Sequence, residues 1–187
     1  MMNKINLFVF ISLILSVIGC YSKKVSKDDK KMLITASDIV NDYRFDIKKL
    51  NTGKFAKENF LGTIDLSYEY ESSDKEGDYL YIYHTISKET NTSEARDTYA
   101  INAFGDKYFR EKGVTFEKKE GWFTYGDASS LSLVIYENEP TGFLFTFRKQ
   151  KYVYYFLIYG LYFEAEEDWI EFITPKLKEF EDLKEGI

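Results

Sequence analysis

The segment that most constrains the fold of this chain is residues 152–159, with the sequence YVYYFLIY. Successive side chains of a β-strand point to opposite sides, so a strand of this composition is apolar on both faces. Such a strand must run through the middle of a sheet that is covered on each side. We therefore expect a layered fold in which helices pack against a sheet.

Shorter segments in which apolar and polar side chains alternate predict the other strands. The clearest is Thr63–Glu71, and a polar turn joins it to residues 79–86 as a hairpin. After a helical segment the two-residue period returns, and short turns join these later strands as antiparallel hairpins. They lie at residues 114–118, 130–136, 142–148 and 152–159, and residues 122–125 are a further, shorter candidate.

Two segments have the periodicity of amphipathic helices. The first covers residues 95–112, follows the N-cap signal Thr-Ser-Glu at 92–94 and ends at Gly113. The second follows the acid-rich residues 164–168, whose carboxylates favour the positive end of a helix dipole. Pro175 makes this second segment either two short helices or one kinked helix.

Together these segments predict one α+β domain, an antiparallel sheet of about six strands packed with helices in the order β-β-α-β-β-β-β-α. Before them, residues 32–60 give a weaker pattern: a helical turn at 37–38, a short edge strand near 43–47, and a loop or short helix at 55–60.

The aromatic last strand ends at Gly160 and leads into an amphipathic C-terminal helix. This element order resembles the PsbP/Mog1-like α/β sandwich over residues 60–183. In that family the fold serves photosystem assembly, a GTPase partner and envelope interactions. The resemblance therefore implies a binding role more than catalysis, and it transfers no functional residue.

The N-terminal segment indicates where the domain is located. Lys4 precedes about a dozen apolar or small residues, which is the layout of a secretory signal peptide. The run is shorter than the roughly 20 apolar residues that a membrane-spanning helix requires. Its end, Val17-Ile18-Gly19-Cys20, resembles the lipobox of bacterial lipoproteins.

The lipobox resemblance implies that the chain is cut after Gly19 and that Cys20 is acylated on its sulfur and on its new amine. Two or three acyl chains hold a protein firmly at a membrane. The alternatives are an incidental cysteine at the end of an ordinary signal and a remnant of a transmembrane anchor.

We predict a signal peptide at residues 1–19, a lipidated Cys20 with a lysine-rich tether at 20–31, and one domain at 32–187. The expected location is the bacterial cell envelope, on the extracytoplasmic side of a membrane.

Charge argues against a nucleic-acid partner. Residues 21–31 hold five lysines and two aspartates, whereas residues 32–187 hold 19 basic and 29 acidic side chains, a net charge of −10. Binding to phosphates needs a basic footprint, which the acidic domain lacks. The lysine-rich segment is either a solvated spacer, which we favour because aspartates interrupt it, or a contact for anionic lipid head groups.

The sequence offers little of the chemistry that catalysis requires. His84 is the only histidine and has apolar neighbours on its strand face, so we interpret it as a core or edge residue. With a single histidine and a single cysteine, a zinc site would consist almost wholly of carboxylates. The chain has no Gly-x-Ser-x-Gly elbow and no glycine-rich phosphate loop. We predict no catalytic, cofactor-binding or metal-binding residue.

Aromatic residues are the remaining feature, with 16 Tyr, 16 Phe and 2 Trp. They form two sequence clusters that are candidates for a binding surface, because aromatic rings offer large rigid contact areas. The clusters are Tyr79, Tyr81 and Tyr83 on one strand face, and Trp122, Phe123 and Tyr125 just before Gly126. The alternative is that helices cover the tyrosines and that Trp122 fills the end of the sheet.

These observations favour a lipid-anchored, non-catalytic module that binds another protein or an envelope polymer through the aromatic residues. A second hypothesis is a carrier that holds a small apolar ligand in a cavity between sheet and helix. A third is a hydrolase that uses only carboxylates. An exposed aromatic patch favours the first hypothesis, and an enclosed pocket favours the second.

Overall fold

The computed structural model describes residues 21–43, 53–72, 79–103 and 113–187. At its centre lies β8 (Tyr152–Tyr159), between β4 (Tyr81–Lys88) and β7 (Glu139–Lys149) in an antiparallel sheet. Residues 152–158 are all buried. The α+β class and the central place of the two-sided apolar strand are therefore confirmed.

In the described residues the sheet has eight strands, in the order β1-β2-β3-β4-β8-β7-β6-β5. The five strands outside the central three are β1 (Tyr21–Ser22), β2 (Lys54–Phe60), β3 (Thr63–Glu71), β5 (Thr115–Lys118) and β6 (Ala128–Tyr136). Every neighbouring pair is antiparallel. The chain therefore builds two meanders, β1 to β4 and β5 to β8, which meet where β4 pairs with β8.

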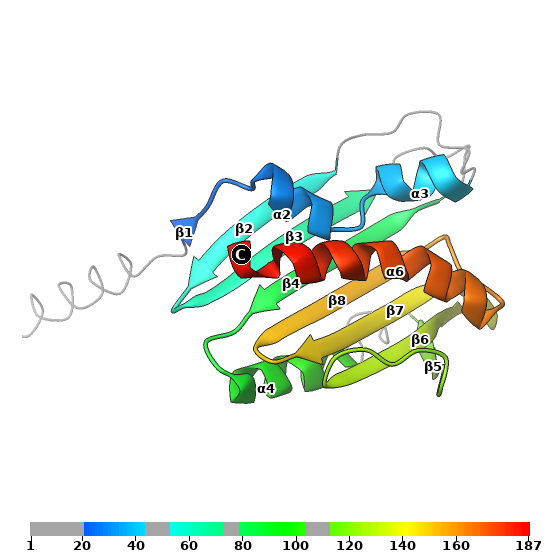
Figure 1. Cartoon of the computed structure of the whole chain (residues 1–187). Helices are drawn as coiled ribbons and strands as arrows, with labels where there is room; N and C mark the ends of the chain where they lie inside the picture. Colours follow the sequence, from blue (N-terminus) through cyan, green and yellow to red (C-terminus); the bar gives the residue numbers. More distant parts are fainter. Residues whose placement is uncertain (1–20, 44–52, 73–78, 104–112) are drawn as a thin grey trace, which may run out of the picture.

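Helices cover both sides of this sheet (Figure 1). One face carries α2 (Lys27–Met32), α3 (Ala36–Tyr43) and α6 (Glu166–Leu183), which is followed by the 3-10 turn η1 (Lys184–Gly186). The other face carries α4 (Thr92–Ala103), which contacts β7 and β8. We call these the first face and the second face.

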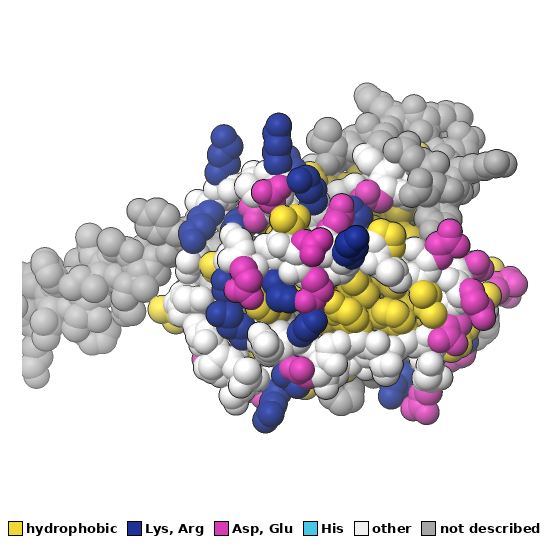
Figure 2. All heavy atoms as spheres, viewed as in Figure 1, with side chains coloured by type: hydrophobic (Ala, Val, Ile, Leu, Met, Phe, Trp, Pro, Cys, Tyr) yellow, Lys and Arg dark blue, Asp and Glu magenta, His cyan; other side chains and the backbone are white. Residues whose placement is uncertain are grey.

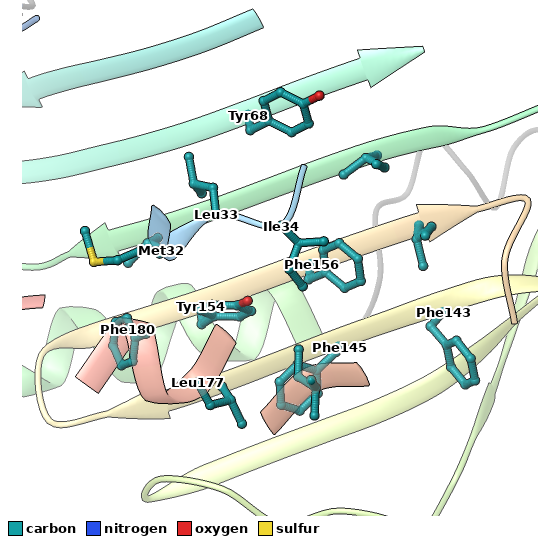
Figure 3. Close-up of a cluster of buried hydrophobic side chains, with 14 of the residues drawn as sticks. Met32, Leu33, Ile34, Tyr68, Phe143, Phe145, Tyr154, Phe156, Leu177 and Phe180 are labelled. Carbon is teal, nitrogen blue, oxygen red and sulfur yellow. The ribbon is translucent and has the colours of Figure 1, made fainter. Parts of the chain in front are cut away.

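The core on the first face is rich in aromatic side chains (Figure 3). The indole of Trp169 on α6 lies 5.1 Å from the Phe143 ring and 5.3 Å from the Phe145 ring, centroid to centroid. One helical turn after another, α6 then buries Ile173, Leu177 and Phe180. The amphipathic C-terminal helix predicted from the sequence is thus confirmed, and it is one continuous helix that contains Pro175.

Two strands were not foreseen, and both lie at the β1 edge of the sheet. Residues 55–60, expected to be a loop or short helix, belong to β2. Its inward side chains include Lys57, whose Nζ lies 2.8 Å from the Asp29 carboxylate, with both groups nearly inaccessible to water. A search for apolar periodicity treats a lysine as outward-facing, so it cannot recognise a strand that buries one.

The folded part also begins earlier than residue 32, the boundary predicted from the sequence. Residues 27–32 form α2, which begins with a capping box: the Ser26 hydroxyl accepts from the Asp29 N–H, and the Asp29 carboxylate accepts from the Ser26 N–H. For residues 27–31 the solvated-spacer interpretation is wrong.

The remaining differences concern element ends. Residues 122–125 form a loop instead of a strand. The cap of α4 is Asn91, whose side-chain oxygen accepts from the backbone N–H groups of Ser93 and Glu94. The helix predicted at 95–112 is described as far as Ala103, and residues 104–112 lie outside the described part. For the edge strand predicted near 43–47, Tyr43 instead ends α3, and residues 44–47 also lie outside the described part.

Candidate functional site

The second face of the sheet presents a row of tyrosines that α4 leaves partly uncovered. Tyr79, just before β4, is 46% exposed, and Tyr83 is 36% exposed. Tyr81 between them is half-buried. The rings make edge-on contacts with tyrosines of β8: Tyr79 with Tyr159 at 5.5 Å, and Tyr83 with Tyr155 at 6.0 Å.

Beside Tyr83 the second face is hollowed by an open groove of about 870 Å³ between α4 and the strands. Its three charged lining side chains are all carboxylates, and the structure places no lysine or arginine among its described lining residues. The lining residues are Glu58, Asp65, Ser67, Tyr83, Thr85, Ser87, Glu89, Thr98, Ile101, Asn102 and Tyr155.

Strand register brings two of these carboxylates together. Glu58 on β2 stands directly opposite Asp65 on β3, and Asp65 stands opposite Ser87 on β4. Like charges at directly opposite positions repel one another. Both side chains are exposed. The groove therefore has a negative wall next to an aromatic one.

Glu89 has a structural role in the same groove. It is 8% exposed, and its carboxylate accepts hydrogen bonds from the Thr63 hydroxyl at 3.1 Å and the Thr98 hydroxyl at 2.7 Å. Since Thr98 lies on α4 and Thr63 on β3, these bonds fix the helix over the sheet. Glu58 and Asp65 are the carboxylates that remain accessible to a ligand.

The carboxylates also affect the tyrosines of this face. Burial and the neighbouring Glu71, which accepts a hydrogen bond from the Tyr79 hydroxyl at 3.2 Å, raise the pKa of Tyr79 to about 12. Burial and then the charge of Glu69 raise the pKa of Tyr81 as well. Both phenols therefore stay protonated in neutral solution, where they act as polar tips and hydrogen-bond donors.

The second aromatic cluster lies on the first face, on the other side of the sheet from the tyrosine row. Its three residues are partly buried and pack against the main core. The Phe123 ring lies 5.7 Å from that of Phe145, and the Tyr125 ring lies 4.7 Å from that of Phe147. Lys119 covers the Trp122 ring at 5.4 Å. The structure therefore separates the six predicted residues into a partly exposed row and a packing cluster.

His84 is part of the core. It is completely buried, and its Nδ1 accepts a hydrogen bond from the Ile34 N–H at 2.8 Å. The centroid of its ring lies 4.3 Å from that of Tyr154 and 5.5 Å from that of Phe156. Burial, together with the positive charge of Lys176, lowers the pKa of His84 well below 6.5. The core interpretation made from the sequence is confirmed.

A second open groove, of about 820 Å³, lies on the first face between α3, α6 and the segment after β8. Phe163, Phe172 and Pro175 contribute apolar surface to it. At its charged end Lys176 lies 3.2 Å from Asp38 and 3.1 Å from Glu179, so this cation offsets part of the negative charge of the lining. Of the two grooves, only the one on the second face combines exposed carboxylates with an absence of cations among its described lining residues.

In the described part of the chain, no group of three or more His, Cys, Asp or Glu side chains is placed to hold a metal ion. None of the described helices has the length and apolar character needed to cross a membrane. Cys20 and the signal-like residues before it lie outside the described part. Comparisons with protein-family models, curated proteins and solved structures found no match.

The groove residues Glu58 and Asp65 were not among the candidates chosen from the sequence. Asp65 stands on the polar face of the clearest predicted strand, and the acids of that face were an available signal. Glu58 lies on β2, which was not recognised as a strand. Only the pairing register shows that these two carboxylates share a groove.

Proposed function

We propose that this chain is a lipid-anchored, non-catalytic binding module of the bacterial envelope whose second face binds a partner that carries cationic groups. The observation that carries this proposal is the groove, which the exposed Tyr83 ring lines together with the carboxylates of Glu58 and Asp65. Aromatic faces attract ammonium and guanidinium groups, and carboxylates add charge complementarity.

A lysine-bearing or arginine-bearing protein segment and an amine-bearing envelope polymer both present such groups. The acidic balance of residues 32–187 adds a long-range attraction that increases the rate of encounter with cationic partners. A nucleic acid does not fit this surface, because its phosphates would be repelled.

The absence of catalysis remains part of the proposal, and the state of the titratable groups supports it. The single histidine is buried, and its pKa is lowered far from the range in which it would exchange protons in neutral solution. Tyr79 and Tyr81 have raised pKa values, so almost none of the phenolate form that could accept a proton is present in neutral solution. A hydrolase based on carboxylates alone is the less favoured alternative.

The carrier hypothesis is also less favoured. Aromatic side chains fill the space between the sheet and α6, and the groove beside α3 is open and contains paired charges. The element order supports a PsbP/Mog1-like sandwich, and the lipobox supports acylation of Cys20 and an extracytoplasmic location. These assignments belong to the proposal.

Acylation is tested by metabolic labelling with a palmitate analogue. The Cys20→Ala variant should take up no label and should accumulate as an unprocessed precursor, whereas the wild-type chain should be labelled and shortened. Normal labelling of the variant would contradict the lipid-anchor part of the proposal.

The binding site is tested with the full chain in detergent and two fluorescent peptides, one of alternating lysine and glycine and one of alternating serine and glycine. Fluorescence anisotropy at low ionic strength should show binding of the lysine peptide only. Replacing Tyr83 with alanine should weaken that binding about fivefold to tenfold, the loss of roughly 1 to 1.4 kcal/mol expected for a cation–π contact.

Tyr136 provides a matched control for Tyr83. It is 37% exposed and makes an edge-on contact with Tyr159 at 6.4 Å, but it does not line the groove. Asp65→Asn should weaken binding, while Glu167→Gln at the start of α6 should not. Equal losses from the groove variants and the control variants would show that the peptide binds the acidic surface non-specifically and would contradict the proposed site.

A further inference from the structure

The turn between β2 and β3 carries two exposed apolar side chains in succession. Phe60 at the end of β2 is 52% exposed, and Leu61 in the turn is 70% exposed. Single exposed apolar residues are ordinary on protein surfaces. Two adjacent ones at the tip of a hairpin need a physical reason, because glycine and short polar residues are favoured in turns.

The backbone at this tip makes leucine an unfavourable choice. Phe60 pairs with Thr63, so the turn has two central residues, Leu61 and Gly62, with φ of 50° and 92°. Positive φ at both positions is the requirement of a type I′ turn, for which Asn-Gly is the preferred pair. A bulky side chain in this conformation is strained, and such strain persists at sites that serve a function.

The turn between β6 and β7 provides a comparison within the same chain. Its central residues, Glu137 and Asn138, also have positive φ, of 52° and 68°, between the paired residues Tyr136 and Glu139. This turn lies at the opposite end of the sheet from Leu61 (Figure 1). Since its residues are polar, turn geometry does not account for the apolar tip.

The start of the described chain lies beside this tip. β1 pairs with the end of β2, with Tyr21 opposite Asn59 (Figure 1). Cys20 is bonded to Tyr21, and consecutive Cα atoms are only about 3.8 Å apart. Acyl chains on Cys20 would therefore hold the Phe60 end of the sheet close to the membrane surface.

We infer that the Phe60–Leu61 tip is a second membrane contact, which inserts among lipid head groups when the chain is anchored. The inference rests on the proposed acylation of Cys20. Apolar side chains gain from burial at the boundary between head groups and acyl chains, and exposed lysines there attract anionic lipids. Lys23 and Lys24, which follow β1, are both exposed.

This contact would orient the domain as well as hold it. The strands would extend away from the bilayer, and the acidic start of α6, with Glu166, Glu167 and Asp168, would lie at the far end. Figure 2 shows the charges in this arrangement, with most lysines and arginines of this face toward β1 and mainly acidic side chains at the opposite end. On the face shown in Figure 2, anionic head groups would favour the same orientation, whereas Glu58 and Asp65 near the tip on the second face would oppose close approach.

A fluorescent label at the tip tests the contact. The full chain is purified from bacterial membranes and reconstituted into vesicles of phosphatidylethanolamine and phosphatidylglycerol. Leu61→Cys and the matched variant Asn138→Cys each receive an environment-sensitive nitrobenzoxadiazole dye. We expect the dye at residue 61 to emit at a shorter wavelength and to be quenched by lipids with a nitroxide near the head group. The dye at residue 138 should show neither effect.

The wild-type chain separates failure of the anchor from failure of the tip contact, because Cys20 is its only thiol. Vesicle-bound chains whose dye at residue 61 remains in water would overturn the tip contact and leave the anchor intact. A wild-type chain that leaves the vesicles and takes up dye at Cys20 would overturn both.

Exchanging residues between the two turns tests whether Leu61 serves the fold instead. Leu61→Asn should raise the denaturant concentration at which the chain unfolds, because asparagine suits this turn position. Asn138→Leu, the reverse change in the matched turn, should lower it. A lower midpoint for Leu61→Asn would show that the leucine stabilises the domain and would overturn the inference.

Discussion

Replacing Glu181 with glutamine should destabilise the protein in neutral solution and much less in acid. The carboxylate lies on α6 and accepts from the Tyr125 hydroxyl at 2.5 Å and the Lys149 ammonium at 2.8 Å. It also pairs with Lys184 one turn further along the chain. These contacts join α6 to β7 and to the aromatic loop before β6, so their loss affects the whole first face.

The pKa of this carboxyl gives the magnitude. Burial by itself would raise the pKa of Glu181, but hydrogen bonds from its two lysine partners and from Tyr125 lower it from 4.5 to about 2. At about 1.36 kcal/mol per pKa unit, the shift corresponds to an upper limit of about 3 kcal/mol. Solvent screening of this partly exposed group reduces the expected loss to about 2 kcal/mol.

The direction of the pH dependence follows from the lowered pKa. A carboxyl whose pKa is lower in the folded state than in the unfolded state stabilises the fold fully above the unfolded-state value. That contribution disappears as the pH falls from 4.5 towards about 2. The difference between wild type and Glu181→Gln should therefore shrink from about 2 kcal/mol at pH 7 to about 1 kcal/mol or less near pH 3.

Urea unfolding at both pH values, followed by tryptophan fluorescence, measures this difference because Trp169 is completely buried. Asp182→Asn is the matched control, since Asp182 is the exposed neighbour on the same helix. It should change the free energy of unfolding by no more than about 0.5 kcal/mol. An equal loss for Glu181→Gln at both pH values, or an equal loss from the control, would refute the electrostatic explanation.

Two further substitutions test packing and buried charge. A Cβ added at Gly142 would lie 1.9 Å from the Ile158 carbonyl oxygen. Gly142→Ala should therefore lower the free energy of unfolding by more than about 2 kcal/mol in the same urea titration. A Cβ added at Gly186 would have no atom within 4 Å, so Gly186→Ala should have little effect. Lys57→Ala should cost about 3 to 5 kcal/mol by leaving the Asp29 carboxylate buried and unpaired. Adding Asp29→Asn to Lys57→Ala should restore part of the lost stability, measured by thermal unfolding. If it restores none, the loss does not come from an unpaired buried carboxylate at Asp29.

Periodicity predicted those parts of the fold in which one side-chain pattern dominates. Residues 152–159 are apolar on both faces and form the central β8, and the stripe that includes Trp169 and Phe180 forms the buried face of α6. It did not predict β2 or α2, because the buried pair Lys57 and Asp29 joins two segments that contain few apolar residues. Their stability depends on a partner that is 28 residues away in sequence.

The candidate site was predictable only in part, for a similar reason. Alternation places Tyr81 and Tyr83 on one strand face, but their exposure depends on how far α4 extends over the sheet. The position of Glu58 opposite Asp65 depends on strand register, which a single strand does not encode. The loop containing Trp122 looked like a binding cluster because the helix beside it, α6, is distant in sequence.

The pairing of β4 with β8 also has a consequence for how the chain folds. Each meander consists of strands that are neighbours in sequence and can form by local contacts, but residues 64 to 78 positions apart must meet to join them. Contacts at such separations close slowly. Synthesis begins at the N-terminus, so β8 and α6 are the last elements of the sheet and its helices to leave the ribosome. Until then the chain contains two incomplete half-sheets. Truncation between β7 and β8 would leave both halves with an open apolar seam.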